Sequence, residues 1–142
     1  MIKPNVFITT EKSKLDFDFI HSFLNDSYWS KGITKDRVIK SIENSYCFGL
    51  FLNDVQIGFA RVITDFTSLA YLLDVFIDKN YQGNGFGNIL LKHIFEDQNL
   101  SEIKKWILAT NDAQALYKKY GFSELDNSNN KYLIRESERS KL

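Results

Sequence analysis

The sequence contains a single cysteine, Cys47, so it cannot form an intrachain disulfide. A structural zinc site is not expected either, because the two histidines, His21 and His93, lie far apart in the chain. There is no excess of charge of either sign, since 18 lysine and arginine residues balance 18 aspartate and glutamate residues. No general attraction to nucleic acid or to an anionic membrane is therefore expected.

Long apolar runs are also missing. No uninterrupted apolar stretch reaches membrane-spanning length, and the first residues, MIKPNVFITTEK, lack the hydrophobic segment of a secretory signal. We therefore expect a cytoplasmic protein that does not bind membranes. The sequence has the composition of one soluble globular domain, with 44% hydrophobic and 25% charged residues. A single domain over residues 1–142 is accordingly expected.

The pattern of apolar residues predicts a mixed α/β fold. Strands are expected at Asn5–Thr10, Tyr46–Leu52, Val55–Asp65, Ala70–Ile77, Ile103–Thr110 and Lys131–Arg135. Helices are expected at Lys14–Asp26, 34–42, Gly85–Asp97 and Asn111–Phe122. A tight turn at Asn53-Asp54 makes the second and third strands a hairpin, and the unit over 70–110 should be a parallel crossover. The order β-α-α-β-β-β-α-β-α-β thus predicts one mixed sheet of about six to seven strands with helices on both faces.

Three glycines at alternate positions, Gly83, Gly85 and Gly87, separate a strand from a helix. Backbone N–H groups at the start of a helix suit a phosphate or pyrophosphate, and glycine lets the phosphate approach the backbone. The alternative is a glycine-rich turn that serves only the geometry of the chain. A Walker pattern is absent, and G-x-G-x-G in mid-chain does not fit a dinucleotide-binding fold.

The run Gln82-Gly83-Asn84-Gly85-Phe86-Gly87 matches the pattern Q/R-x-x-G-x-G/A. With the segment ALYKKYGF and the order of elements, it resembles the GNAT superfamily of N-acetyltransferases over nearly the whole chain. The resemblance implies that acetyl-CoA, as co-substrate and without a metal, lies between the splayed strands at 70–77 and 103–110. The residues implied to contact it are Val75, Phe76, Ile77, Gln82, Gly83, Asn84, Gly85, Phe86, Gly87, Asn88, Thr110, Asn111 and Tyr117.

The resemblance also implies the attack of an amine on a thioester. Tyr117 matches the tyrosine that serves the family as an acid for the leaving thiolate; the alternative is that it packs as an ordinary helix aromatic. A backbone N–H near Val75 or Phe76 is the implied donor to the oxyanion. Asp74 interrupts an apolar strand. It is either the base for the amine or the partner of a cation such as Arg61.

One position departs from the family pattern. Many members carry an asparagine seven residues before the tyrosine, and here that position is Thr110, with Asn111 one residue late. Either the hydroxyl of Thr110 makes the cofactor contact or Asn111 reaches it from the start of the helix. Asn111 is equally explained as a helix N-cap.

The acceptor is predicted to be a primary amine of a small molecule or amino acid. Tyr28 and Trp29 follow the first helix, where the family places its acceptor pocket, and could form an aromatic wall for a small amine or simply cap the core. Asp65 and Arg61 are further candidates for binding the acceptor, and Asp65 and His21 are further candidates for the base. The alternatives are a protein lysine or N-terminus as acceptor, or a non-catalytic domain that senses acyl-CoA. The resemblance also leads us to expect a homodimer.

Overall fold

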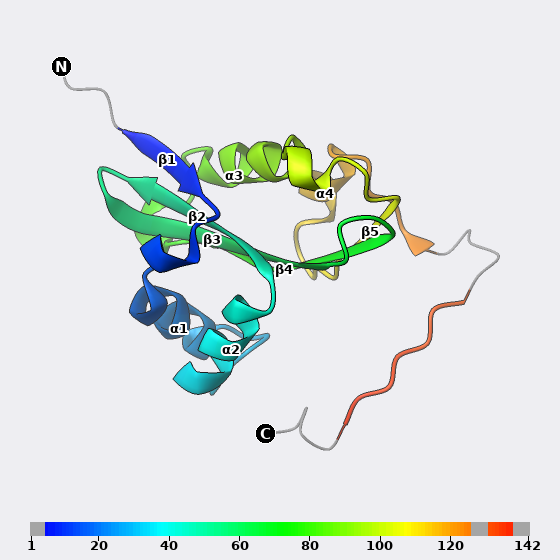
Figure 1. Ribbon diagram of the computed structural model, residues 1–142, viewed down its shortest axis with the longest axis horizontal. Coiled ribbons are helices and arrows are strands. Elements are labelled where there is room, and N and C mark those ends of the chain that lie inside the picture. Colours follow the sequence, from blue (N-terminus) through cyan, green and yellow to red (C-terminus); the bar gives the residue numbers. More distant parts are fainter. Residues whose placement is uncertain (1–4, 126–130, 138–142) are drawn as a thin grey trace. The chain divides into compact units, whose positions relative to one another are not determined.

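The computed structural model describes residues 5–125 and 131–137, and Figure 1 shows the elements that they form. The chain has two compact units, Met1–Ala109 and Thr110–Leu142. The expectation of one domain over residues 1–142 stays a prediction. In the described part of the chain, no helix is long and apolar enough to cross a membrane.

The first unit is built on a five-stranded sheet with the strand order β1-β2-β3-β4-β5. Neighbouring strands are antiparallel except β4 and β5, which run parallel as expected for the predicted crossover. The strands are β1 (Val6–Thr9), β2 (Tyr46–Leu52), β3 (Val55–Thr64), β4 (Leu69–Ile77) and β5 (Lys105–Ile107). The mixed sheet is confirmed, with slightly fewer strands than predicted.

The β2–β3 hairpin follows from its turn residues. Asn53 and Asp54 have positive φ values of 49° and 68°, and Leu52 pairs with Val55 directly across the turn. Two successive residues of this kind form the type of turn whose twist matches that of the flanking strands. Asparagine and aspartate tolerate this conformation better than most residues, so the predicted turn is confirmed.

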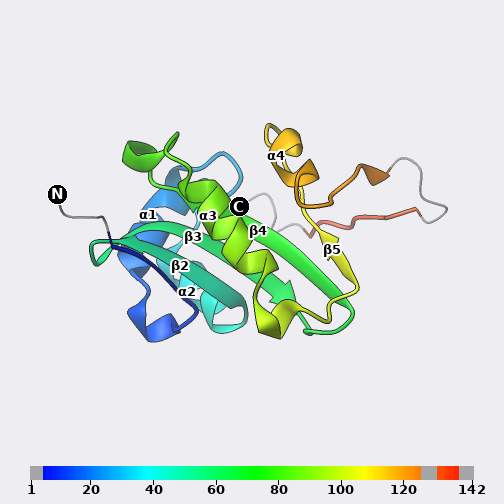
Figure 2. The same cartoon turned by 90° about the horizontal axis from the view of Figure 1, so that it is seen from above.

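Helices cover both faces of the sheet in the first unit. Helices α1 and α2 lie on one face and α3 on the other (Figure 1), and Figure 2 shows α3 crossing over the sheet. Asp16 and Thr34 cap α1 and α2 by accepting backbone hydrogen bonds of 3.0 and 3.3 Å. The helices are α1 (Phe17–Asp26), α2 (Lys35–Glu43) and α3 (Phe86–Phe95). The core between α1, α2 and the sheet contains Leu15, Ile20, Leu24, Val38, Ile42, Cys47, Phe59 and Phe76.

The described residues of the second unit form one short helix, α4 (Gln114–Lys118). It is shorter than the predicted helix over Asn111–Phe122. The chain leaves it through Gly121, which has φ +94° and donates its N–H to the carbonyl of Lys118 at 3.1 Å. Glycine adopts this left-handed conformation without strain, but α4 itself ends at Lys118, three residues before the predicted stop at Gly121.

The predicted last strand, Lys131–Arg135, is wrong. Residues 131–137 are described but have no regular secondary structure. The side chains of Leu133 and Ile134 are 94% and 86% exposed. Aromatic and β-branched residues favour a strand only when a paired strand and a buried face support them, and this segment has neither.

Candidate functional site

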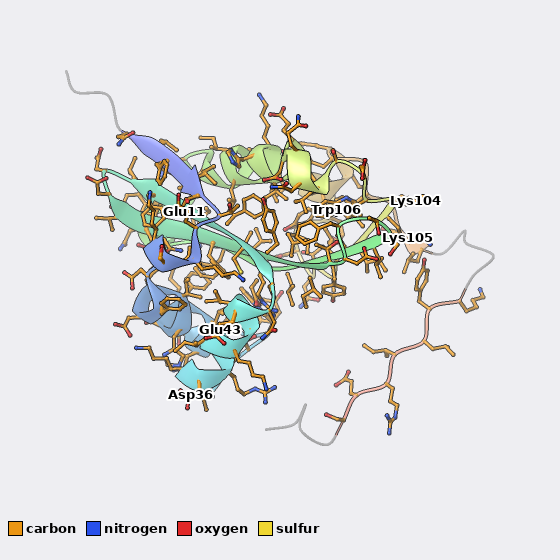
Figure 3. All side chains as sticks on the ribbon, in the orientation of Figure 1. Glu11, Asp36, Glu43, Lys104, Lys105 and Trp106 are labelled. Atoms are coloured by element: carbon orange, nitrogen blue, oxygen red, sulfur yellow. The ribbon has the colours of Figure 1, made fainter. Side chains whose placement is uncertain are left out.

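Strands β4 and β5 pair over a short stretch only. Leu69 pairs with Lys105 and Tyr71 with Ile107, where β5 ends (Figure 3 marks Lys105). Strand β5 is therefore shorter than predicted. Strand β4 continues to Ile77, and no other strand of the described residues pairs with it on that side. Backbone groups on this edge that lack a strand partner can bond to a ligand instead, although the carbonyl of Ile77 already accepts a hydrogen bond from Gln82.

Strand β4 carries a bulge at Asp74. The β3–β4 register shifts between Phe59 and Arg61, so that Asp74 and Val75 both lie opposite Ala60. Asp74 has φ +53°, a conformation that costs a non-glycine residue about 1–3 kcal/mol. A bulge turns backbone groups out of the ladder, often next to an active site. Sequence reasoning missed it, and the only signal was a carboxylate inside an apolar strand.

Two side chains hold the carboxylate of Asp74. Arg61 Nε donates to Oδ2 at 2.9 Å, and Trp29 Nε1 donates to Oδ1 at 2.9 Å. Arg61 also donates to the hydroxyl of Ser45 at 3.1 Å. The side chains of Arg61 and Asp74 are only 14% and 7% exposed, and charges so well buried require a partner. The pairing of Asp74 with Arg61 is confirmed, and its role as a base stays a prediction.

The glycine segment leads into α3 without a side-chain cap. Gly83 and Gly85 have φ values of +81° and +85°, and Gly85 is the N-cap of α3. A Cβ atom added at Gly83, Gly85 or Gly87 would meet no atom within 4 Å. The three glycines therefore border open space at the positive end of a helix. Gly87 has no positive φ, so neither its conformation nor its neighbours demand glycine there.

The side chains of this segment brace the loop. Gln82 Nε2 donates to the carbonyl of Ile77 at 2.8 Å. Asn84 Nδ2 donates to the carbonyls of Tyr81 and Gln82, both at 3.2 Å, and the ring of Phe86 lies edge-on to that of Tyr81. With these side chains engaged, the backbone N–H groups are the natural contacts for an anion.

A pocket of about 480 Å³ lies among α1, the loop after it and the segment following β4. The ring of Phe23 stacks on that of Phe76 in β4 with centroids 3.9 Å apart, so the pocket adjoins β4 beyond the bulge. Tyr28 and Trp29, the predicted acceptor residues, both line it. Its aromatic lining residues are Phe19, Phe23, Tyr28 and Trp29, and its charged ones are Asp26, Asp78 and Lys79. Sequence reasoning missed the three charged residues.

The other predicted acceptor residues do not line the pocket. Asp65 closes the turn before β4, where its carboxylate accepts hydrogen bonds from the backbone of Thr67 and Ser68 and from the hydroxyl of Ser68. These bonds hold the pKa of Asp65 well below its usual range. His21 shares a 2.9 Å hydrogen bond with the carbonyl of Ile33, which ties α1 to the segment before α2. Both side chains thus have structural contacts of their own.

The second unit contains three further predicted residues, Thr110, Asn111 and Tyr117, whereas the predicted Asn88 lies on α3. Tyr117 is buried and meets Phe122 edge-on with ring centroids 5.9 Å apart. Burial, reinforced by the nearby carboxylate of Asp112, raises the pKa of the Tyr117 phenol. The hydroxyl of Thr110 accepts the backbone N–H of Ala113 at 3.1 Å. The roles of Tyr117, Thr110 and Asn111 toward a cofactor stay predictions.

A metal centre is not apparent at the described positions. Residues 5–125 and 131–137 contain no group of three histidine, cysteine, aspartate or glutamate side chains placed to hold a metal ion. Cys47 is buried, and burial raises the pKa of its thiol to about 12. A thiol so strongly protonated is a poor nucleophile and a poor metal ligand.

The sequence matches the acetyltransferase (GNAT) domain over residues 43–124. It is 31% identical to the [ribosomal protein bS18]-alanine N-acetyltransferase of Haemophilus influenzae, over 88% of this chain and 87% of that one.

Solved structures agree with this match. A GNAT-family protein from Xanthomonas campestris pv. campestris has a TM-score of 0.84 and 35% sequence identity, covering 92% of this chain and 94% of its own. A protein predicted to be an acetyltransferase, from Clostridium acetobutylicum, was crystallised with acetyl-CoA. It shares the fold with a TM-score of 0.66 at 17% identity, over 94% of this chain and 96% of its own.

Proposed function

The chain belongs to the GNAT acetyltransferase family, and on this premise we propose that it transfers the acetyl group of acetyl-CoA to the primary amine of a small molecule or amino acid. The observation that carries the proposal is the glycine segment, which opens onto free space at the N-terminus of α3 directly after the unpaired edge of β4. The acetyl-CoA in the Clostridium acetobutylicum protein supports the same co-substrate.

Acetyl-CoA fits the residues of the first unit. The backbone N–H groups from Gln82 to Gly87 would hold its pyrophosphate. The edge of β4 at Val75–Ile77 would take the amide groups of its pantetheine arm as an added strand takes a sheet edge. When bound, acetyl-CoA supplies the thioester: the amine nitrogen bonds to the carbonyl carbon, and the carbon–sulfur bond breaks.

Three groups of this chain have proposed roles in that transfer. The N–H of Val75 at the bulge of β4, or that of Phe76 next to it, donates to the developing oxyanion. Asp74 accepts the proton of the amine, directly or through water; each of its oxygens already accepts one hydrogen bond and has a second lone pair available. Tyr117 gives a proton to the leaving thiolate.

A second candidate acceptor is a protein N-terminus. It is favoured by the likeness to the Haemophilus influenzae protein, which by its name acetylates an alanine of a ribosomal protein. A peptide substrate requires an open groove for several residues. The pocket of about 480 Å³ beside β4, bounded by aromatic rings, supports the small amine better.

The experiment that tests the proposal is acetyl-CoA turnover with a panel of amines, amino acids and alanine-starting peptides. Free thiol release gives the rate, and mass spectrometry of the product identifies the acetylated group. Acetylation of small amines is the expected result. Turnover of peptides alone would establish the second candidate, and thermal stabilisation by CoA without any turnover would indicate a sensor domain.

A loop variant provides the control. Gly85→Glu places bulk and negative charge where the pyrophosphate is proposed, and we expect it to abolish both turnover and stabilisation by CoA. Unchanged CoA affinity in this variant would overturn the assignment of the loop.

A further inference from the structure

We propose that the pocket beside β4 selects amines with an apolar body and no carboxylate group, with Asp78 as the counter-charge for the ammonium of the incoming substrate. This inference rests on the proposed function, because it names the acceptor class for the same reaction. Under this inference the acceptors are amines without a carboxylate group, and amino acids are excluded.

Aromatic rings form the apolar part of the pocket. The ring of Phe23 stacks on that of Phe76 in β4, and its centroid lies 6.3 Å from that of Trp29. Tyr28 meets Trp29 edge-on at 5.1 Å. Rings placed in this way bury an aryl or branched alkyl group well, and the face of a tryptophan attracts an ammonium ion.

The charges of the pocket do not cancel. Lys79 Nζ lies 3.4 Å from Asp26 Oδ2, so the one cation of the lining is already matched to one of the two carboxylates. Asp78 is a half-buried residue, and its carboxylate has no hydrogen-bond or ion-pair partner in residues 5–125 and 131–137. One negative charge is therefore left over. It attracts an ammonium ion and repels the α-carboxylate of an amino acid.

Asp78 is not needed to hold the chain in place. Its backbone N–H donates to the carbonyl of Ile57 at 2.7 Å, and its carbonyl accepts the N–H of Tyr81 at 2.8 Å. Its side chain makes no capping bond to the 3₁₀ turn Lys79–Tyr81. Replacing the carboxylate by an amide therefore removes the charge and leaves the local backbone bonds unchanged.

A pair of matched substrates tests the inference directly. 2-Phenylethylamine and L-phenylalanine share the ring, the two-carbon chain and the primary amine, and differ by the carboxylate. We expect kcat/KM for the amine to exceed that for the amino acid by about tenfold or more. Asp78→Asn should raise KM for the amine by about tenfold with little change in kcat. The ratio of kcat/KM for the amine to kcat/KM for the amino acid should therefore fall.

The control for the loss of one charge is Asp36→Asn. Asp36 lies on α2 (Figure 3). It is exposed and is not among the residues that line the pocket. The variant should keep both the rate and the preference of the unaltered protein. An equal loss of preference in Asp36→Asn and Asp78→Asn would overturn the assignment to Asp78.

Binding without turnover separates this inference from the proposed function. Calorimetric titration of the two compounds into the CoA-bound protein should give a tighter Kd for 2-phenylethylamine, whether or not the compound is acetylated. Tighter binding of L-phenylalanine would overturn the inference and point to Lys79 as a carboxylate ligand. Tighter binding of the amine without acetylation would uphold the inference and contradict the proposed reaction on this acceptor.

Discussion

Trp29 donates its indole N–H to Asp74 over 2.9 Å, although the two residues are 45 positions apart in the sequence. Trp29 lines the pocket, and Asp74 is the left-handed residue of the β4 bulge. One hydrogen bond therefore joins the proposed acceptor pocket to the part of β4 where the backbone leaves the ladder. We therefore expect a substitution of Trp29 to affect the bulge, and a substitution of Asp74 to affect the pocket.

Trp29→Phe keeps an aromatic ring in the pocket and removes this hydrogen bond. We expect a loss of about 1 kcal/mol in the free energy of unfolding, because Asp74 Oδ1 loses a donor. We also expect kcat to fall more than the affinity for CoA, since the bulge and not the glycine segment is disturbed. Urea unfolding and steady-state kinetics measure the two effects. Tyr28→Phe is the control, because Tyr28 is exposed and should change stability by less than about 0.5 kcal/mol.

Arg61→Met removes the guanidinium and keeps an apolar stem of similar length. The carboxylate of Asp74, whose side chain is only 7% exposed, would then retain Trp29 as its one hydrogen-bond partner among the described residues. Breaking a buried ion pair in this way should destabilise the protein by about 3–5 kcal/mol in urea unfolding. The double variant Arg61→Met with Asp74→Asn should lose less than the sum of the single variants. Strict additivity would show that the pair is not coupled.

Gly87→Ala is expected to change the stability of the protein and its affinity for CoA in opposite directions. Gly87 lies in the first turn of α3 with free space above it. Alanine should stabilise the helix by up to about 1 kcal/mol while weakening the binding of CoA. Gly85→Ala has a different expected effect on stability, since φ +85° disfavours alanine by about 1–2 kcal/mol. Thermal unfolding with and without CoA measures both, and unchanged CoA affinity in Gly87→Ala would contradict close approach of the pyrophosphate.

Tyr117→Phe tests the proposed acid. We expect CoA binding to persist and kcat to fall by about 10²-fold. Because burial raises the pKa of the phenol, Tyr117 stays protonated through neutral pH. An acid must be protonated to act, so activity should be lost only as the pH rises through a pKa above about 10. That alkaline limb of the pH–rate profile should be missing from the variant, and full activity of the variant would remove Tyr117 from this role.

Cys47 gives a pH dependence of stability. Burial raises the pKa of its thiol from 9.0 to about 12, so the unfolded chain loses this proton first as the pH rises. The neutral thiol therefore makes its full contribution to the free energy of unfolding below about pH 9. That contribution is lost between about pH 9 and about pH 12, at about 1.4 kcal/mol per pH unit. Cys47→Ala should show a shallower loss of stability than the unaltered protein between about pH 8 and about pH 10 in urea unfolding. Parallel curves would contradict the high pKa.

Much of the first unit could be predicted from sequence because its signals are local. The turn at Asn53-Asp54 needs two residues that tolerate positive φ, and Gly85 marks the start of α3. The apolar periodicity of α1 and α2 is a property of single segments and is read directly. The hydrophobic pattern of β4 likewise predicted a central strand, and β4 lies between β3 and β5.

The features that were missed depend on contacts between distant segments. The residues next to Asp74 in the sequence do not predict its left-handed conformation. The side chains that hold its carboxylate, Arg61 and Trp29, come from other elements. In the sequence, Asp78 and Lys79 are indistinguishable from the polar residues that usually follow a strand. Their place in the pocket depends on α1, which contributes Asp26 to the same lining. The expected strand at Lys131–Arg135 was wrong for the opposite reason. Its residues have β propensity, but propensity alone does not form a strand without a neighbouring strand to pair with.

The open edge of β4 beyond Tyr71 has a consequence outside catalysis. A row of unpaired backbone groups on a strand is a template for another strand, including one from a second copy of the chain. A bound co-substrate arm would shield the same groups. Acetyl-CoA would then act as a protector against aggregation, and preparations stripped of it should precipitate sooner on warming than preparations that contain it.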